Sequence, residues 1–265
     1  MQFQGKIALI TGGGGGIGRA AALGFAGRGA TIVVVDHDGA AGQASADLVR
    51  QRGGNASFVQ ADVTKSADVA AYVQATLALH GRIDCFFNNA GIEGHVTSIE
   101  DYDEAMFDQV IAVNLKGVYL GMKHVLPTML AQGAGAIVNT ASVAGLVGAP
   151  GMAAYVASKH GVLGLTKVAS NDVAGRGVRV NAICPGPVET RMMRSLEAQR
   201  NPANPDGVAG LYRAGIPTGR YALPDEVANT VMYLCSDLSG DITGTHLVID
   251  GGRLAGGAGQ PIKRG

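Results

Sequence analysis

The chain has 265 residues, and 21 Lys and Arg balance 21 Asp and Glu, so the formal net charge is zero. This balance provides no bulk attraction to nucleic acid or anionic membranes, and no apolar run reaches the ~20 residues of a membrane-spanning helix. The N-terminus has no basic patch before a long apolar segment, and the three cysteines form no metal-like pair. We therefore expect a cytoplasmic protein with reduced thiols and without a metal site.

Short β-branched runs alternate with alanine-rich helical stretches. The predicted strands cover residues 6–11, 31–36, 56–61, 83–88, 135–140, 178–184 and 246–250. The predicted helices cover residues 16–28, 40–52, 66–80, 103–130, 152–174 and 224–236. Apolar strands that alternate with helices predict an α/β Rossmann fold, a doubly wound seven-stranded parallel sheet with helices on both faces. We expect one domain over residues 1–265, with Pro127 kinking or ending the fourth helix.

Two segments depart from this alternation. Residues 188–219 are rich in Arg, Met, Asn and Pro and are too long for a plain connection. They are interpreted as a mobile lid over a substrate site. The tail, residues 253–265, is expected to be loose or to pack between subunits.

Five consecutive glycines connect the first predicted strand to the first predicted helix. Bare backbone at a helix N-terminus offers N–H groups to a pyrophosphate. Two registers are open: Gly13, Gly15 and Gly18 fit G-x-G-x-x-G, whereas Gly12, Gly16 and Gly18 fit T-G-x-x-x-G-x-G. A flexible connection is the alternative, but the position within a βαβ unit favours dinucleotide binding.

Asp36 ends the second predicted strand, at the place where a carboxylate can accept hydrogen bonds from both hydroxyls of an adenosine ribose. The same carboxylate would repel a 2′-phosphate, and the next residues, His37, Asp38 and Gly39, include no Lys or Arg. The sequence therefore favours NAD over NADP. Capping of the next helix is the alternative role, which Asp38 could serve equally well.

A second group of polar residues has the chemistry of an active site. Tyr155 and Lys159 are four apart in a predicted helix, so they share one face, ~6 Å apart at Cβ. A nearby cation can lower the pKa of a phenol from ~10 by ~1–3 units, which would make Tyr155 a proton acceptor. Ser142 follows the fifth strand and could bind a substrate oxygen or cap a helix. Asn114 is unfavourable within a helix, where a kink with a bound water and a buried polar contact are both open.

Taken in order, these motifs resemble the short-chain dehydrogenases/reductases over essentially the whole chain. The matching pieces are TGGGGGIG at 11–18, Asp62-Val63, NNAG at 88–91, Asn114, Ser142, Tyr155 with Lys159, and Pro185-Gly186 followed by Thr190. One departure is the unbroken glycine run, which offers few side-chain contacts to phosphate.

The resemblance implies a role for each matched position. It implies that Tyr155 is the general acid/base and that Lys159 lowers its pKa and binds the nicotinamide ribose. Ser142 would orient the substrate, and Asn114 would hold a water that links Lys159 to solvent. The implied cofactor contacts are Gly12, Gly15, Gly16, Ile17, Gly18, Asp36, Asp62, Val63, Asn89, Ala90, Gly91, Tyr155, Lys159, Pro185, Gly186, Val188 and Thr190.

The expected reaction is the NAD-dependent interconversion of a secondary alcohol and a ketone. The segments that would line the substrate site, residues 91–99, 142–152 and 188–212, are mostly apolar and favour an uncharged, moderately bulky, cyclic or aromatic substrate. A 3-oxoacyl-thioester reductase shares these motifs but usually prefers NADPH. A dinucleotide-sensing protein without chemistry would be expected to lack the Tyr–Lys pair. The resemblance also implies a homotetramer, formed through the helices at 103–130 and 152–174 and the last strand.

Overall fold

The computed structural model describes residues 1–256 and confirms the predicted sheet. All seven strands pair in parallel, in the order β3-β2-β1-β4-β5-β6-β7. The strands are β1 (Ile7–Thr11), β2 (Thr31–Asp36), β3 (Asn55–Gln60), β4 (Cys85–Asn88), β5 (Gly135–Thr140), β6 (Val178–Pro185) and β7 (His246–Ile249). The chain runs outward from β1 to β3 and then returns to place β4 beside β1. This reversal opens a crevice at the carboxyl ends of β1 and β4, where open α/β sheets bind ligands.

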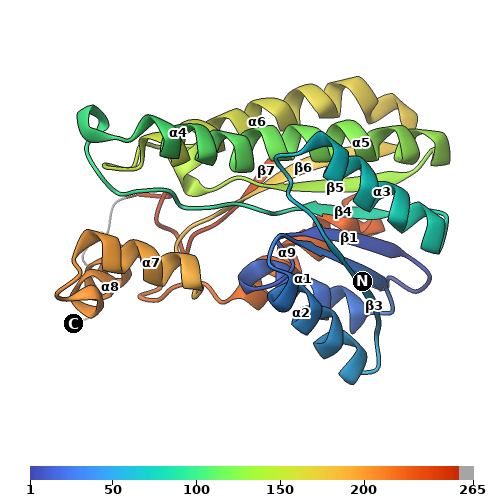
Figure 1. Cartoon of the computed structure of the whole chain (residues 1–265), viewed down its shortest axis with the longest axis horizontal. Coiled ribbons are helices and arrows are strands. Elements are labelled where there is room, and N and C mark those ends of the chain that lie inside the picture. The colour runs from blue at the N-terminus through green and yellow to red at the C-terminus, as the bar shows by residue number, and fades with distance from the viewer. Residues whose placement is uncertain (257–265) are drawn as a thin grey trace, which may run out of the picture.

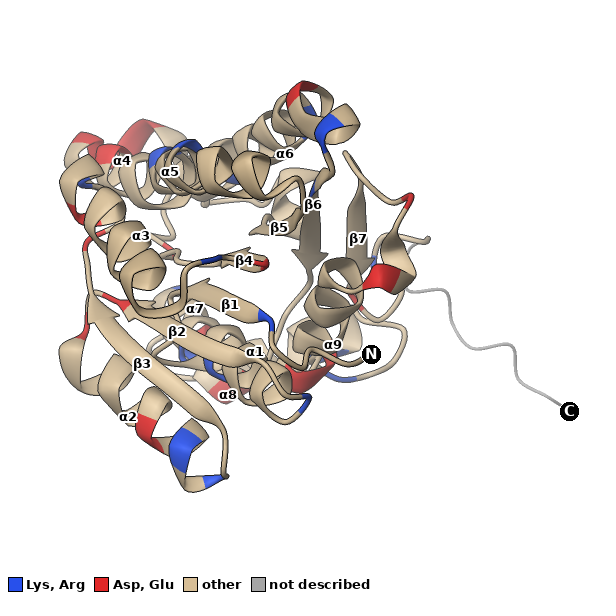
Figure 2. Ribbon diagram, turned by 90° about the vertical axis from the view of Figure 1, so that its right-hand side faces the viewer, with Lys and Arg blue, Asp and Glu red and all other residues tan. Residues whose placement is uncertain are grey.

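Helices cover both faces of the sheet because alternate strand residues point to opposite faces. In β1, Leu9 belongs to one buried cluster, whereas Ala8 and Ile10 belong to the other. Figure 2 shows the sheet between the two helical layers. One layer contains α1 (Gly16–Ala26), α2 (Gly39–Gln51) and α9 (Pro224–Cys235), and the other contains α3 (Ser66–His80), α4 (Glu104–Ile111), α5 (Gly117–Gln132) and α6 (Ala153–Val173). Single 3₁₀ turns lie at Ile99–Asp101, Val143–Gly145, Ala174–Arg176 and Asp237–Ser239.

The long helix predicted at 103–130 is interrupted by a π-helical turn at Ala112–Lys116, between α4 and α5. The interruption contains Asn114, the residue whose poor helix propensity marked this place in the sequence. Of the two effects expected of Pro127, ending the helix is wrong, since α5 continues to Gln132, and a kink stays a prediction. Pro127 is exposed, so water can satisfy the carbonyl that loses its N–H partner.

The lid segment, residues 188–219, contains two helices that the sequence reading does not identify. They are α7 (Arg191–Arg200) and α8 (Pro205–Ala214), and they form a separate lobe at the lower left of Figure 1. Thr190 caps α7 and Asn204 caps α8, each accepting a backbone N–H. The lobe has its own small core of Met193, Ala209, Ile216 and Tyr221. Of the tail, residues 257–265 lie outside the described residues.

Candidate active site

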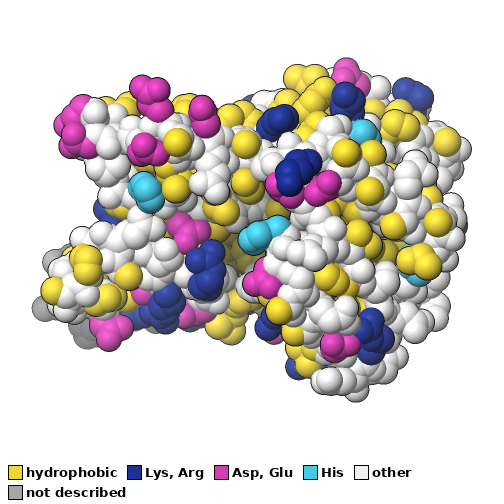
Figure 3. All heavy atoms as spheres, in the orientation of Figure 1, with side chains coloured by type: hydrophobic (Ala, Val, Ile, Leu, Met, Phe, Trp, Pro, Cys, Tyr) yellow, Lys and Arg dark blue, Asp and Glu magenta, His cyan; other side chains and the backbone are white. Residues whose placement is uncertain are grey.

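A pocket of about 890 Å³ lies at the carboxyl edge of the sheet and extends under the lid segment. Figure 3 shows the molecular surface hollowed between the lid lobe and the rest of the protein. Most of the predicted site residues line this pocket: Gly12, Gly15, Gly16, Ile17, Asp36, Asp62, Val63, Asn89, Ala90, Gly91, Ser142, Tyr155, Lys159, Pro185, Gly186, Val188 and Thr190. The other two predicted site residues, Gly18 and Asn114, do not line the pocket. They contact residues that do.

The conformation of the glycine turn decides between its two registers. Gly12 and Gly16 have positive φ angles of 63° and 49°, which side chains disfavour. A Cβ on Gly18 would lie 2.8 Å from the carbonyl carbon of Gly12 and 2.9 Å from Cα of Gly13, closer than van der Waals contact permits. Gly15, by contrast, is extended and has open space around it. Gly12 and Gly16 are therefore required by their backbone conformation and Gly15 is not, which favours the T-G-x-x-x-G-x-G register.

Asp36 is bound to this turn. Its carboxylate oxygens accept the backbone N–H of Gly14 at 2.8 Å and that of Asp38 at 3.0 Å. A Cβ on Gly14 would lie 2.7 Å from the Asp36 carboxylate, so this glycine allows the close approach. Asp38, in turn, caps α2 by accepting the N–H of Ala41. The capping alternative therefore falls to Asp38, and Asp36 remains at the pocket wall.

Asp62 and Val63 form a hydrogen-bonded turn at the pocket wall. Asp62 accepts the hydroxyl and the backbone N–H of Thr64 at 2.7 and 3.0 Å, and these hydrogen bonds lower the pKa of Asp62. Val63 packs against Gly117 at the start of α5, where a Cβ would lie 3.0 Å from a Val63 methyl group. Both residues line the pocket as the sequence predicts.

Asn89 ties three strand ends together. Its amide donates to the carbonyls of Thr11 and Gly12, and its oxygen accepts the hydroxyl of Thr140. The Thr11 hydroxyl accepts the backbone N–H of Asn89 and Ala90. These bonds hold the ends of β1, β4 and β5 in one arrangement below the cleft.

Asn114 uses its side chain to anchor the loop that follows β4. It accepts the N–H of Ile92 at 2.8 Å and donates to the Ile92 carbonyl at 2.9 Å, and the same amide contacts Ser158 on α6 at 3.3 Å. The side chain is fully buried, so these bonds satisfy an amide that would otherwise be unpaired. The structure therefore shows the buried polar contact, and the expected link from Asn114 through a water to Lys159 stays a prediction.

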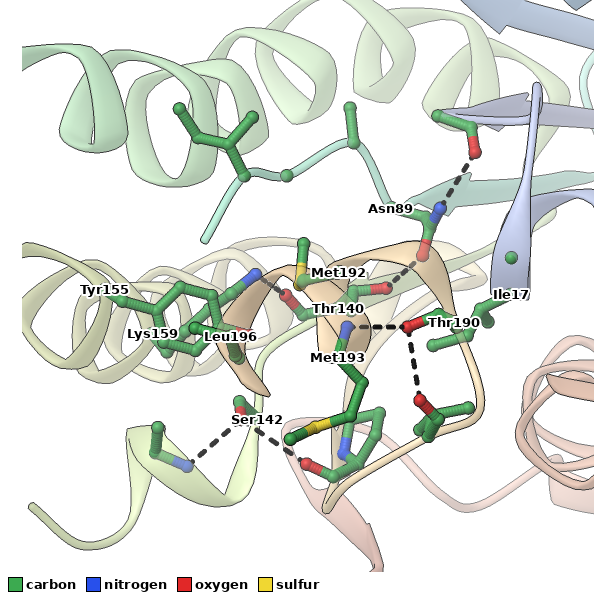
Figure 4. A pocket seen from close by; sticks show the side chains of 18 of the residues that line it. Ile17, Asn89, Thr140, Ser142, Tyr155, Lys159, Thr190, Met192, Met193 and Leu196 are labelled. Atoms are coloured by element: carbon green, nitrogen blue, oxygen red, sulfur yellow. Dashed lines mark hydrogen bonds between the residues drawn. The ribbon is translucent and has the colours of Figure 1, made fainter. Parts of the chain in front are cut away.

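Tyr155, Ser142 and Lys159 converge at one end of the pocket (Figure 4). Tyr155 and Lys159 come from the first turns of α6, and Ser142 follows β5. Lys159 donates from Nζ to the Thr140 carbonyl at 2.7 Å, and its Nζ lies 5.5 Å from the centre of the Tyr155 ring. Because Thr140 also binds Asn89, the sheet edge that holds the glycine turn also positions the lysine.

Burial governs the proton affinities of this group. It raises the pKa of Tyr155 to about 12, and the Ser142 side chain opposes the rise. It lowers the pKa of Lys159 to about 8, because a buried ammonium loses hydration. Removal of water therefore sets the net direction of the Tyr155 pKa, while the Lys159 ammonium points at the Thr140 carbonyl. That Lys159 lowers the pKa of Tyr155 stays a prediction.

The segment after β6 closes the other side of the pocket. Gly186 donates its N–H to Ile249, and a Cβ on it would lie 3.0 Å from Asp250. Thr190 donates its hydroxyl to the Val188 carbonyl and caps α7, and its methyl group faces Gly16 across the cleft. Pro185, Gly186, Val188 and Thr190 thus form a wall opposite the glycine turn.

Sequence reasoning missed several residues that position this site. Thr140 belongs to no motif, and Thr11 enters one without a role of its own, because their roles depend on partners 51 and 78 residues away. Within residues 1–256, no group of three or more His, Cys, Asp or Glu could hold a metal ion, and no helix is long and apolar enough to cross a membrane. The three cysteines are free and buried.

Comparison with known proteins agrees with this geometry. The model of a family described as "Enoyl-(Acyl carrier protein) reductase" matches residues 13–253. The chain is also 42% identical over 256 residues to levodione reductase of Leifsonia aquatica, which covers 96% of both chains. The chain belongs to the short-chain dehydrogenase/reductase family. It is an oxidoreductase of this family.

The chain is also similar to another dehydrogenase and to two solved structures. Cyclohexanol dehydrogenase of Acinetobacter sp. is 40% identical, over 94% of this chain and 95% of its own. The crystal structure of levodione reductase superposes with a TM-score of 0.94 at 41% identity, covering 96% of this chain and 99% of that one. The structure of NAD⁺-bound xylitol dehydrogenase has a TM-score of 0.92 at 36% identity, covering 95% and 100%.

Proposed function

We propose that the protein interconverts a secondary alcohol and a ketone with NAD as hydride carrier and Tyr155 as the acid/base. The observation that carries this proposal is the convergence of Tyr155, Ser142 and Lys159 in the same pocket as the glycine turn. A reacting carbon between these two groups of residues would have a proton acceptor on one side and a dinucleotide on the other.

The residues present fit a dinucleotide. The glycine turn leaves room for phosphates because Gly15 has nothing around its Cβ position, and α1 begins directly after it. Asp36 lies at the pocket wall with its carboxylate held by two backbone N–H groups, ready to accept ribose hydroxyls. A 2′-phosphate would meet this carboxylate with no Lys or Arg adjacent to it in sequence, so we propose NAD rather than NADP.

In oxidation, the Ser142 hydroxyl and the Tyr155 phenol would both hold the substrate oxygen. Once Tyr155 has lost its own proton, its phenolate would take the alcohol proton, and a bound nicotinamide would accept the hydride. Lys159, fixed by Thr140, places its amino group beside the ring, where its positive charge would stabilise the phenolate that forms when Tyr155 donates its proton in reduction. In reduction, the same phenol returns its proton to the carbonyl oxygen. The high pKa of Tyr155 suits proton donation, so oxidation should need alkaline pH.

The walls beyond the catalytic residues favour an uncharged, moderately bulky substrate. They include Val147, Met152, Met192 and Leu196, and Figure 4 shows Met192 and Leu196 of α7 near Tyr155. Such walls bind apolar rings better than phosphorylated compounds. The names of relatives, levodione reductase and cyclohexanol dehydrogenase, support a cyclic ketone or alcohol as substrate.

A 3-oxoacyl-thioester reductase remains the second candidate. The description of the matching family model names an acyl carrier protein as part of the substrate, which favours it. Asp36 argues against it, because we expect such reductases to use NADPH. Turnover of a 3-oxoacyl thioester with NADPH, at a rate above that with any cyclic ketone and NADH, would select this candidate.

We further propose that the protein is a homotetramer in which α5 and α6 of one subunit pack against neighbouring subunits through their outer faces. An apolar groove runs between these helices and is lined by Ile111, Leu115, Lys116, Tyr119, Gly161, Gly164, Leu165 and Val168. Val168 is 59% exposed and Tyr119 is 46% exposed, which is unusual for such side chains.

The test of the reaction uses the purified chain with NAD or NADP and a panel of cyclic and linear secondary alcohols, followed by absorbance of the reduced cofactor. Tyr155→Phe should bind the cofactor with unchanged affinity, measured by fluorescence of bound NADH, and lose turnover by at least ~10²-fold. Near-normal turnover of Tyr155→Phe would remove the tyrosine from the mechanism, and turnover only with NADP would remove the cofactor assignment.

A further inference from the structure

A buried carboxylate lies next to the catalytic group without a role in the chemistry above. Glu93 follows the NNAG segment on the loop after β4 and is 7% exposed. The loop is held on both sides of it. Ile92 is bound by Asn114 through two hydrogen bonds, and Gly94 has a φ of 70°. The position of Glu93 is therefore set by the body of the protein.

The partner of Glu93 comes from the lid. Arg191, the first residue of α7, places Nη1 3.2 Å from one Glu93 oxygen and Nη2 3.5 Å from the other. The Arg191 side chain is 76% exposed, whereas that of Glu93 is 10% exposed. A carboxylate removed from water needs a compensating charge, and among residues 1–256 the ion-pair partner of Glu93 is Arg191 of α7.

Other contacts join α7 to the same loop and to the segment that precedes α6. Gln199 accepts the N–H of Val96 at 3.0 Å and donates to the Gly94 carbonyl at 3.2 Å. Arg200 donates to the Pro150 carbonyl at 3.1 Å. These polar contacts fix the angle at which α7 docks, and all of them would break if the helix moved away.

Glu93 also acts on the catalytic tyrosine, since its negative charge raises the pKa of Tyr155. The other groups that face the phenol are Cys184 on β6, which raises the same pKa, and Ser142 after β5, which lowers it. Lys159 lies on the same helix, over the ring. Glu93 is thus the acidic side chain facing Tyr155 whose charge is paired by a lid residue.

We propose that Glu93 is a positioning residue and that its ion pair with Arg191 couples docking of α7 to proton transfer at Tyr155. With α7 docked, Arg191 neutralises Glu93, and Tyr155 gives up its proton more easily. With α7 displaced, the uncompensated carboxylate holds the proton on the phenol. The base is then most effective when the lid excludes water from the substrate. This inference rests on the proposed role of Tyr155.

Three variants test the coupling: Glu93→Gln, Arg191→Met and the double variant. The measurement is kcat/KM for alcohol oxidation as a function of pH, which rises as Tyr155 loses its proton. Glu93→Gln removes the negative charge and should move the rising limb to lower pH. Arg191→Met leaves the charge unpaired and should move the limb to higher pH, by on the order of one unit. The double variant should follow Glu93→Gln, and Arg191→Lys should restore the wild-type limb in part.

A matched control separates this effect from loss of any lid contact. Arg200→Met also removes one positive charge and one docking contact from α7, but Arg200 does not contact Glu93. The rising limb of its pH profile of kcat/KM should therefore stay at the wild-type pH. Shifts of Glu93→Gln and Arg191→Met in the same direction, or a raised KM with no shift in either, would overturn the coupling. Failure of the proposed function looks different, because Tyr155→Phe would then keep its turnover whatever the two charge variants do.

Discussion

The glycine turn allows a sharp test of how this chain binds its cofactor. Gly18→Ala would place a methyl group 2.8 Å from the carbonyl carbon of Gly12 and 2.9 Å from Cα of Gly13, and still closer to the Gly12 oxygen. All of these atoms belong to the backbone of the turn, so no side chain can rotate away. The only relief is to shift α1 away from the turn, which also disturbs its packing against the sheet.

Overpacking of this kind destabilises a protein by about 1–3 kcal/mol, and backbone against backbone should reach the upper end. For a chain of this size, about 3 kcal/mol lowers Tm by roughly 6–12 °C. Gly15→Ser is the matched control, because Gly15 is exposed, has an extended φ of −164°, and has open space at its Cβ. It occupies the N-cap of α1, where serine is favoured, so its Tm should be unchanged or slightly raised.

Thermal unfolding and NADH titration measure both effects. We expect Gly18→Ala to have a lower Tm and to bind NADH at least ~10-fold more weakly, because the N–H groups of the turn no longer point at the phosphates. A Gly18→Ala protein that melts within 2 °C of wild type and binds NADH normally would refute the steric reasoning, with ~2 °C taken as the smallest shift expected from 1 kcal/mol. If Gly15→Ser lost as much Tm and NADH affinity as Gly18→Ala, Gly15 would also be required, and the G-x-G-x-x-G register would describe the turn.

Three other perturbations follow from the same geometry. Asp36→Ala should erode the preference for NAD over NADP by about tenfold or more in kcat/KM, and an unmodified protein that prefers NADPH would contradict the assignment. Burial lowers the pKa of Lys159 to about 8, so between pH 8 and the ordinary lysine value the unfolded chain binds more protons than the folded one. Its contribution to the free energy of unfolding therefore rises with pH across that window, and urea titrations should show a flatter pH dependence for Lys159→Met. Val168→Glu places a charge in the apolar groove beside α6, and analytical ultracentrifugation should show smaller assemblies than wild type; an unchanged sedimentation coefficient would point to another interface.

The amino-acid sequence by itself determined the alternation of strands and helices and the chemistry of the site. β2 and β5 match their predicted bounds, and α3 does too, because short apolar runs and alanine-rich stretches carry local periodicity. Tyr155 and Lys159 were found because four residues of α-helix always bring two side chains to one face. The strand-to-helix position of the glycines likewise pointed to a dinucleotide turn.

Tertiary structure decided what depends on residues far apart in the chain. The register of the glycine turn follows from the positive φ angles of Gly12 and Gly16 and the open space at Gly15, and the orientation of Lys159 follows from the Thr140 carbonyl. The direction of the Tyr155 pKa shift depends on how much protein surrounds the phenol, which no spacing of residues encodes. The pair between Glu93 and Arg191 joins positions 98 residues apart. Local sequence sets backbone preferences over a few residues, whereas burial and charge pairing exist only once the sheet has brought distant segments together.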